Sequence, residues 1–288
     1  MYEIISDSSC NLTDDIIGQY KINIISLSYR IGDEEFASYE NGKTTDIKPF
    51  YDRVRKGEIA STSQITRQEC REAFEKILKK GADVLYIGFS SGLSGSFNAG
   101  AMVANELREE YPDRKIIAVD SLAASMGEGL LVYHAALLKE QGKTIDEVSA
   151  WLDANILKLC HWFTVDDLMY LKRGGRISPT TALVGTLMGI KPILHVDDEG
   201  KLINVGKVRG RRHSIDELFN NMKKTCENPQ DQMIFISHGD CFEDARYLES
   251  LIRNELHVKD VVINYVDAVI GAHSGPGTLA LFFLGSKR

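Results

Sequence analysis

The fold is decided by one stretch, Asp83-Val84-Leu85-Tyr86-Ile87-Gly88-Phe89-Ser90-Ser91-Gly92-Leu93-Ser94-Gly95-Ser96. Its first part, Asp83–Phe89, is an apolar run of strand length, and the residues from Ser96 to Glu110 have the spacing of an amphipathic helix. A loop rich in glycine and serine joins the two. Strand, loop and helix in this order are typical of a βαβ unit with parallel strands, so the stretch predicts an α/β fold.

The same alternation continues on both sides of this stretch. In the first half, the other predicted strands are Tyr2–Ser6, Ile22–Tyr29 and Lys115–Asp120, and the other predicted helices are Ile47–Lys56, Arg67–Lys80, Ala124–Gln141 and Thr144–Leu157. In the second half, the predicted strands are Cys160–Val165, Lys191–Val196, Lys201–Val208, Gln232–Ser237 and Val261–Val266, and the predicted helices are Asp166–Leu171, Ser214–Thr225 and Phe242–Asn254. A polar turn ending in Gly200 predicts a hairpin. We predict two α/β domains, 1–158 and 159–288, each a sheet with flanking helices.

Composition excludes several classes of protein. The 288 residues are 43% hydrophobic and 26% charged, as in ordinary globular proteins, and a net charge of -7 disfavours nucleic acid as a partner. No apolar run reaches the roughly 18 residues of a membrane span, and the first residues lack the pattern of a secretory signal. The five cysteines include no Cys-x-x-Cys pair, which suits reduced thiols. We expect a cytoplasmic protein without stable membrane insertion.

The motifs of common enzymes fail. Gly42-Lys43-Thr44 and Gly142-Lys143-Thr144 lack the upstream glycine of a phosphate-binding loop. Neither Ser94 nor Ser274 lies in a G-x-S-x-G nucleophile elbow, and the seven histidines lack metal-ligand spacing. We therefore expect no catalytic residue, no metal and no cofactor.

Two hydroxyl-rich loops remain as candidates for binding an anion. One is Ser61-Thr62-Ser63-Gln64, before the helix near Arg67, and the other is Ser90–Ser96. Backbone N–H groups at a helix N-terminus favour a negative charge, and α/β sheets bind ligands at the carboxyl ends of their strands. The same residues would also serve simply as helix N-caps.

A third candidate segment is Gly271–Thr278, which holds His273 and precedes an apolar run. Near a carboxylate, an imidazole donates a hydrogen bond or orients a neighbouring hydroxyl, although a purely structural histidine is the alternative. A fourth segment is Leu171–Ser178, followed by the apolar stretch 182–192. That stretch mixes small and large side chains and suits either a tunnel wall or an ordinary helix core.

Basic residues gather in two clusters on this acidic chain. One comprises Lys172, Arg173 and Arg176, and the other comprises Lys207, Arg209, Arg211, Arg212 and His213. Such clusters are either solvated faces or docking surfaces for an acidic partner or a phosphate. We predict partner or phosphate contacts by Arg173, Arg176, Arg209 and Arg211.

Taken in order, these segments resemble the DegV family, which includes the FakB-type fatty acid-binding proteins. The match runs from Asp7 to Gly285, and its most specific parts are Thr62-Ser63-Gln64, Ser91–Ser96, Leu171–Ser178, Ile190–Leu194 and Gly271–Gly277. The resemblance implies two α/β domains with a fatty acid between them, its carboxylate held by Thr62 and Ser94 and supported by His273. Further support is expected from neighbouring motif residues, namely Ser63, Gly95, Ser96 and Gly275.

The resemblance also implies a partner. FakB-type members present the fatty acid to a dihydroxyacetone-kinase-like subunit, which phosphorylates the carboxylate for phospholipid synthesis. We therefore expect a carrier of one long-chain fatty acid, such as palmitate, and not an enzyme. Burial of roughly 14 methylenes contributes on the order of 11 kcal/mol before ordering costs. A small-molecule transferase and a lipid-responsive sensor are the alternatives for the same pocket.

Overall fold

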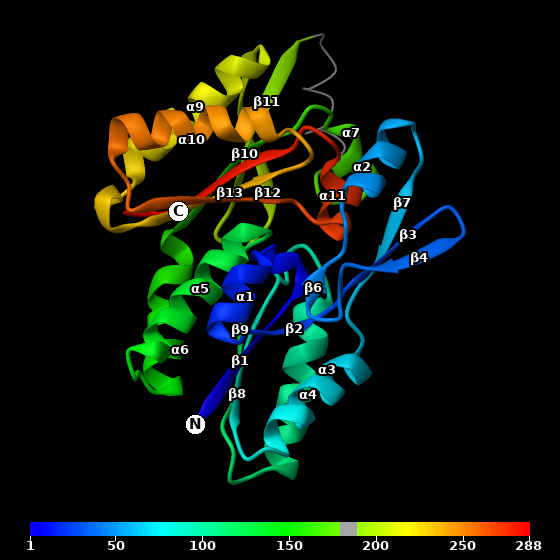
Figure 1. Cartoon of the computed structure of the whole chain (residues 1–288), viewed down its shortest axis with the longest axis vertical. Coiled ribbons are helices and arrows are strands. Elements are labelled where there is room, and N and C mark those ends of the chain that lie inside the picture. Colours follow the sequence, from blue (N-terminus) through cyan, green and yellow to red (C-terminus); the bar gives the residue numbers. More distant parts are fainter. Residues whose placement is uncertain (179–188) are drawn as a thin grey trace.

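The computed structural model describes residues 1–178 and 189–288 as a mixed α/β fold with two main sheets (Figure 1). The strands are β1 (Tyr2–Asp7), β2 (Asn23–Ile25), β3 (Ser28–Ile31), β4 (Glu34–Ala37), β5 (Tyr39–Glu40), β6 (Lys43–Thr44), β7 (Ala60–Ser63), β8 (Asp83–Gly88), β9 (Ile116–Asp120), β10 (Leu159–Thr164), β11 (Ile190–Val196), β12 (Leu202–Arg209), β13 (Met233–His238), β14 (Asp260–Tyr265) and β15 (Leu279–Leu284). The helices are α1 (Asp14–Tyr20), α2 (Lys48–Arg55), α3 (Arg67–Leu78), α4 (Ser96–Glu110), α5 (Met126–Glu140), α6 (Ile145–Asn155), α7 (Met169–Arg173), α9 (Arg211–Thr225), α10 (Phe242–Leu256) and α11 (Ala268–Ser274).

The first main sheet is parallel, with the order β2-β1-β8-β9. The chain runs from β1 outward to β2 and later returns to the other side of β1 with β8. The crevice outside the carboxyl ends of β1 and β8 is therefore a topological switch point, where α/β sheets bind ligands. The loops after β1, β8 and β9 all open at this end.

The predicted strand Ile22–Tyr29 is wrong in one respect, because it forms two strands in different sheets. β2 pairs with β1, whereas β3 pairs with β4 and β7. Between them, the N–H of Leu27 donates to Ser8 Oγ at 2.9 Å, so the backbone leaves the first sheet there. The three-stranded sheet β4-β3-β7 projects from the body of the molecule (Figure 1).

The second main sheet has the order β12-β11-β10-β15-β13-β14. Its neighbours are antiparallel except for β13 and β14. The hairpin of β11 and β12 confirms the predicted turn, with Gly200 at a φ of +74°. The predicted helix Asp166–Leu171 is shifted, since α7 spans Met169–Arg173; just before it, the carboxylate of Asp167 accepts the N–H of Met169 at 2.8 Å.

Helix α5 lies between the two main sheets and belongs to a core that draws on both. Leu85 and Ile87 of the first sheet, Leu130 of α5, and Phe235 and Phe282 of the second sheet are buried in this one cluster. Helices α9 and α10 cover the other face of the second sheet, as Figure 1 shows. The predicted domain boundary at residue 158 lies just before β10, and the division into two domains stays a prediction because the core is continuous.

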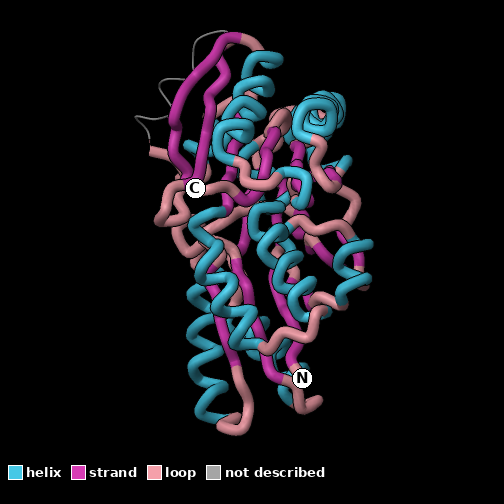
Figure 2. The backbone as a smooth tube through the Cα atoms, turned by 90° about the vertical axis from the view of Figure 1, so that its left-hand side faces the viewer, coloured by secondary structure: helices cyan, strands magenta, loops and turns pink. Residues whose placement is uncertain are grey.

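Two helices of the first half begin with a capping box. Thr144 and Glu147 make the box of α6, and Thr66 with Glu69 makes that of α3. Figure 2 shows helices lying alongside the strands on both sides of the molecule. Along the described part of the chain, none of the helices has the length and apolar character needed to cross a membrane.

Candidate functional site

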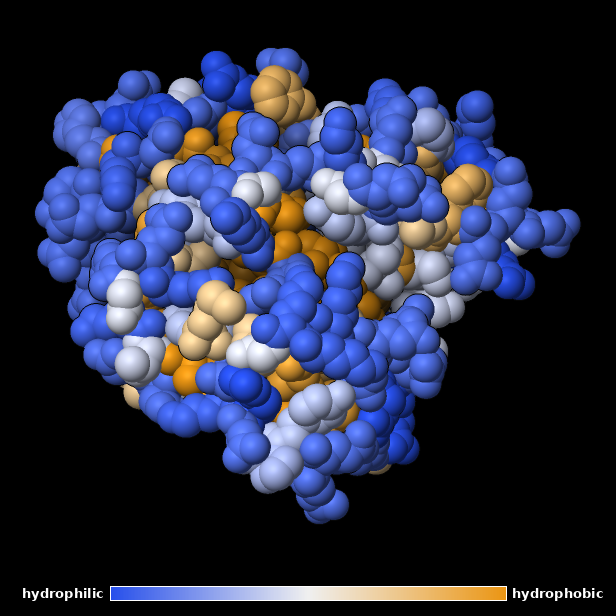
Figure 3. Space-filling view, turned by 60° about the horizontal axis from the view of Figure 1, so that its bottom comes forward, coloured by the Kyte–Doolittle hydropathy of each residue, from blue (hydrophilic) through white to orange (hydrophobic). Residues whose placement is uncertain are grey.

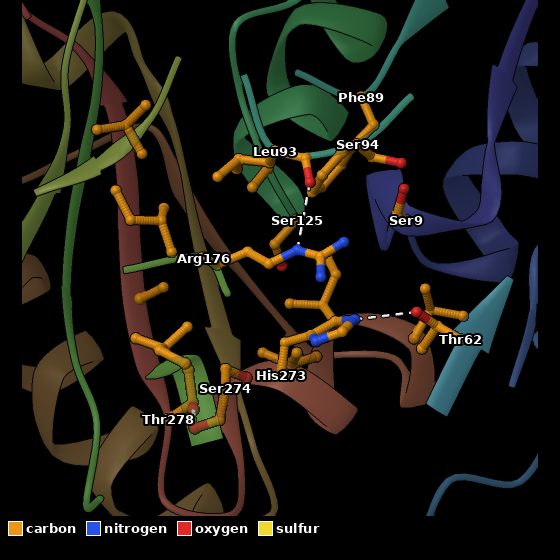
Figure 4. A pocket seen from close by; sticks show the side chains of 18 of the residues that line it. Ser9, Thr62, Phe89, Leu93, Ser94, Ser125, Arg176, His273, Ser274 and Thr278 are labelled. Atoms are coloured by element: carbon orange, nitrogen blue, oxygen red, sulfur yellow. Dashed lines mark hydrogen bonds between the residues drawn. The ribbon is translucent and has the colours of Figure 1, made fainter. Parts of the chain in front are cut away.

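A cavity of about 270 Å³ lies between the switch-point loops of the first sheet and one face of the second sheet. This volume is close to the lower end of the range for ligand pockets, roughly 300–1,000 Å³. In Figure 3, the surface is mostly hydrophilic, and apolar residues gather in the hollowed centre of the face shown. Polar side chains from separate segments meet at one end of the cavity (Figure 4), among them Ser9, Thr62, Ser94, Ser125 and His273.

Thr62 and His273 form a pair at this end. Thr62 lies on β7, opposite Tyr29 of β3. The sequence predicted a loop at this position, because Ala60–Ser63 lacks the apolar alternation that identifies a strand. His273 lies in the last turn of α11, which was predicted only as a glycine-rich segment. The distance between Thr62 Oγ1 and His273 Nε2 is 2.9 Å. With the imidazole proton on Nε2, His273 donates to Thr62, and the hydroxyl proton of Thr62 is free to point into the cavity.

His273 stays neutral over a wide pH range. Burial, assisted by the positive charge of Arg176, lowers its pKa from 6.5 to about 4. Its position is set from both ends of α11. At the start of the helix, Asp267 Oδ1 accepts the N–H of Ile270 at 3.0 Å. At the far end, a Cβ on Gly174 would collide with His273 Nδ1, so only glycine leaves room for the ring.

Ser94 belongs to a second chain of hydrogen bonds, in the loop between β8 and α4. The N–H of Ile65 donates to Ser96 Oγ at 3.2 Å, and the two oxygens Ser96 Oγ and Ser94 Oγ lie 3.0 Å apart. The N–H of Ser96 also donates to Ser94 Oγ, at 3.2 Å. Ser94 Oγ accepts from the Ser96 N–H, and when the Ser96 hydroxyl donates to it as well, the proton of Ser94 is free for a ligand. With the hydrogens placed in this way, the hydroxyl protons of Thr62 and Ser94 are both available at the same end of the cavity.

Arg176 lies in this cavity as well, whereas the sequence predicted it as a contact for a partner or a phosphate. Its Nε donates to Leu93 O at 3.3 Å, and its Nη1 donates to Gly174 O. Burial lowers the pKa of the guanidinium. Within residues 1–178 and 189–288, its hydrogen bonds go to backbone carbonyls, so its charge has no carboxylate partner there. An anionic ligand would supply one.

Asp7 lies beneath the polar end, at the end of β1. It is fully buried and accepts the N–H of Ser9 at 3.0 Å and the N–H of Phe89 at 3.3 Å. Burial raises its pKa to about 6. Asp7 thereby fixes Ser9 and Phe89, two cavity residues that the sequence analysis missed. The rule that ligands bind at the carboxyl ends of strands would have found Ser9, because it lies two residues after the end of β1.

The other residues predicted to support the site have different surroundings. Ser63 and Gly95 line the cavity, and a Cβ on Gly95 would collide with the Gln64 side chain. Ser96 is buried behind Ser94. Gly275 has a φ of +79° and packs against the ring of Tyr170, so it shapes the chain after His273.

The remaining predicted arginines lie outside the cavity lining. Arg173 stacks on the ring of Tyr170, and Arg209 is exposed on β12. Arg211 is held in ion pairs with Asp244 at 2.8 Å and Asp166 at 3.7 Å, so it is less available to a partner than the sequence suggested. A basic groove next to the cavity is lined instead by Lys172, Arg176 and Lys201.

The other end of the cavity is apolar. Its wall consists mainly of side chains on β10, β11 and β15, on the start of α11 and just after β14, namely Phe163, Val196, Val266, Val269, Ile270, Ala280 and Phe282. Most of the segment 182–192, predicted as a tunnel wall, falls in residues 179–188 and so lies outside the described residues. A polar end with free donors and a cation therefore opens onto an apolar space.

Comparisons with known proteins agree with this arrangement. A family model described as "Uncharacterised protein, DegV family" matches residues 1–286. A DegV domain-containing protein of Clostridium perfringens is 46% identical over 287 residues, which cover 100% of this chain and 98% of the relative. A fatty acid-binding DegV family protein from Thermus thermophilus has a similar structure, with a TM-score of 0.89, 26% identity and 99% of each chain covered. DegV of Bacillus subtilis, a fatty acid-binding protein, has a TM-score of 0.84, 28% identity and 99% coverage of each chain.

Proposed function

Because this chain belongs to the DegV family, we propose that it binds one long-chain fatty acid non-covalently, with the carboxylate on Thr62 and Ser94. His273 donates to Thr62 and so turns the threonine proton toward the carboxylate. Arg176 supplies the compensating charge. The acyl chain lies along the apolar face of the second sheet.

One observation carries this proposal. Two hydroxyls, those of Thr62 and Ser94, line the same cavity as a guanidinium without a carboxylate partner among the described residues. A carboxylate is the ligand group that accepts from all three, and an unpaired carboxylate would be costly to bury. The apolar remainder of the cavity suits a hydrocarbon chain, at about 0.8 kcal/mol for each methylene buried.

We further propose that the bound acid is presented to a dihydroxyacetone-kinase-like subunit, which forms an acyl phosphate for phospholipid synthesis. The basic groove of Lys172, Arg176 and Lys201 adjoins the polar end of the cavity and suits the added phosphate. A carrier of this kind leaves the chemistry to its partner. It therefore needs a carboxylate that stays reachable from the groove.

Native mass spectrometry of the protein purified without added lipid tests the binding. We expect an adduct of fatty-acid mass at about one per chain, lost in the Thr62→Ala/Ser94→Ala variant. Ser61→Ala is the matched control, because Ser61 neighbours Thr62 on β7 but does not line the cavity. A mass that stays that of the empty chain after C14–C18 fatty acids are added would overturn the proposal.

The partner is tested separately, by the rate at which a kinase subunit phosphorylates the bound acid. Reversing Arg173 and Arg209 to Glu should slow this rate while the lipid adduct stays intact. Arg211 is left unchanged, since its reversal would break the ion pair with Asp244. An unchanged rate would exclude these two arginines from the docking surface. Turnover by the isolated chain would favour a transferase instead.

A further inference from the structure

The cavity wall contains a fully buried imidazole outside the polar end. His161 of β10 lines the cavity, and its exposed fraction is 1%. Its strand partner is Phe282 of β15, which lies four residues beyond Thr278 and so roughly 13 Å farther along the strand. Thr278 lies beside the end of α11, where its hydroxyl donates to Gly275 O at 2.8 Å. His161 therefore lies along the acyl part of the cavity, away from the helix that carries His273.

Neither nitrogen of this imidazole has a hydrogen-bond partner among the described residues. The carbonyl of Leu159, which acts only weakly on the ring, accepts from Arg288 Nε at 3.1 Å. Burial lowers the pKa of His161 well below its ordinary value, so the ring is neutral, with a proton on one nitrogen and none on the other. Buried polar groups in proteins are almost always hydrogen-bonded. The ring thus holds an unused donor and an unused acceptor beside the acyl chain.

The first turn of α5 lies against the same ring. A Cβ placed on Gly127 would be 2.6 Å from His161 Nε2, which is closer than side chains approach. The imidazole therefore rests directly on the backbone of the helix. The helix begins at Met126, and its first N–H groups have no partner within the helix. Further hydrogen-bond donors thus lie close to the imidazole.

The two polar side chains at the start of α5 are directed elsewhere. Ser125, the N-cap residue, makes no capping hydrogen bond, and its hydroxyl donates to Asn11 Oδ1 at 2.7 Å. Glu128, the acidic residue of the first turn, accepts from Ser6 Oγ of the first sheet at 2.9 Å and does not line the cavity. Since Ser125 lines the cavity (Figure 4), the positive end of the α5 dipole lies at the cavity wall.

We propose that His161 and the start of α5 form a second polar subsite, which binds a hydroxyl group carried by the acyl chain near its middle. This inference rests on the proposed function and names hydroxylated long-chain fatty acids as the substrate class of the same cavity. A hydroxyl both donates and accepts, so it satisfies the unprotonated imidazole nitrogen and accepts from an N–H of the subsite. A plain hydrocarbon chain leaves both groups unpaired.

Competition binding of C18 acids to the wild type tests this inference. The probes are octadecanoic acid, its 10-hydroxy and 12-hydroxy derivatives and 2-hydroxyoctadecanoic acid, compared pairwise by native mass spectrometry. We expect the better of the two mid-chain hydroxy acids to bind about tenfold more tightly than octadecanoic acid, because its hydroxyl pairs with groups that are otherwise unpaired. The 2-hydroxy acid should not share this gain, since its hydroxyl lies beside the carboxylate.

Two variants remove the nitrogens of residue 161. His161→Phe keeps a ring and His161→Leu has a smaller apolar side chain, and both should prefer octadecanoic acid to the mid-chain hydroxy acids. His161→Gln, whose amide both donates and accepts, should keep part of the wild-type preference. His134→Phe is the matched control, because His134 lies on α5 but packs on Trp151 and does not line the cavity. Its preference should equal that of the wild type.

The outcomes distinguish this subsite from the proposed function. Equal binding of octadecanoic acid and both mid-chain hydroxy acids by the wild type would overturn the subsite and leave the proposed function standing. The same conclusion would follow if His161→Phe or His161→Leu kept the full preference for a hydroxyl. Failure of the wild type to bind any of these acids would overturn both proposals. If one of the two apolar variants does not fold, the other decides.

Discussion

The two ends of the cavity are built in different ways. The polar end takes single atoms from β7, the β8–α4 loop, α11 and the segment after α7, which are far apart in the sequence. The apolar end is mainly one face of one sheet, supplied by alternate residues of neighbouring strands. Loss of one directional hydrogen bond at the polar end should therefore weaken the binding of acids specifically. Loss of apolar area at the other end should weaken the binding of all ligands of equal length by a modest amount.

Replacing His273 should give the largest difference between the binding of a fatty acid and that of a fatty alcohol. We expect His273→Leu to weaken fatty-acid binding by about 100-fold, because the Thr62 hydroxyl is then no longer oriented and its hydrogen bond to the ionised carboxylate, which contributes roughly 1.5–3 kcal/mol, is lost. A fatty alcohol of equal length should lose much less, and His273→Gln should recover part of the loss through its amide donor. Calorimetric titration with both ligands measures this. Equal losses for acid and alcohol would show that the two ends do not differ as described.

The neutrality of His273 predicts a pH effect on stability. Its pKa is about 4 in the folded chain and 6.5 when unfolded, so protons bind preferentially to the unfolded state between these values. The stabilisation is complete above pH 6.5 and is lost as pH falls toward 4. His273→Leu should therefore lose about 2 kcal/mol less stability than the wild type between pH 6.5 and 4.5. Urea unfolding at each pH measures the difference, and parallel curves would contradict it.

Arg176 should have an intermediate effect. Arg176→Gln removes the charge that faces the carboxylate, and we expect about tenfold weaker binding of the acid, equal to about 1.4 kcal/mol. Binding to the variant should also depend less on ionic strength. Arg176→Lys keeps the charge but loses the planar guanidinium, so its affinity should lie between those of the wild type and Arg176→Gln. An unchanged affinity at low salt would remove Arg176 from the site.

The smallest effect is expected at the apolar end. Val196→Ala removes apolar surface from the cavity wall and should weaken binding about fivefold, for the acid and the alcohol alike. Ile193→Val is the control, because Ile193 packs in the core on the other face of the same strand. It should cost about 1 kcal/mol of stability without changing affinity. A selective loss for the acid in Val196→Ala would contradict the division of roles.

The sequence predicted the α/β class and most long elements because their apolar periodicity is strong. β8 and α4 were predicted closely from the stretch 83–110, and α6 from the predicted helix Thr144–Leu157. Short elements without such periodicity were missed. β7 consists of small polar residues, and α11 spans seven residues that include a glycine. Their conformations depend on tertiary contacts, such as the pairing of β7 with β3.

The candidate site was predicted in part. Motifs identified Thr62, Ser94 and His273, which the structure brings to one end of a cavity, although their role in binding is still a prediction. Arg176 was recognised as basic, but sequence spacing does not show that a side chain turns inward.

Helix α5 packs against both main sheets, and this shared packing limits how a ligand enters and leaves. Rotating the two halves apart like a clamshell would expose the apolar sides of α5 to water, at about 25 cal/mol for each Å². Exchange by movement of side chains at the rim, such as Arg176 between cavity and groove, avoids that cost. The empty and filled forms should then have the same radius of gyration in solution, unlike proteins that close on a ligand by hinge bending.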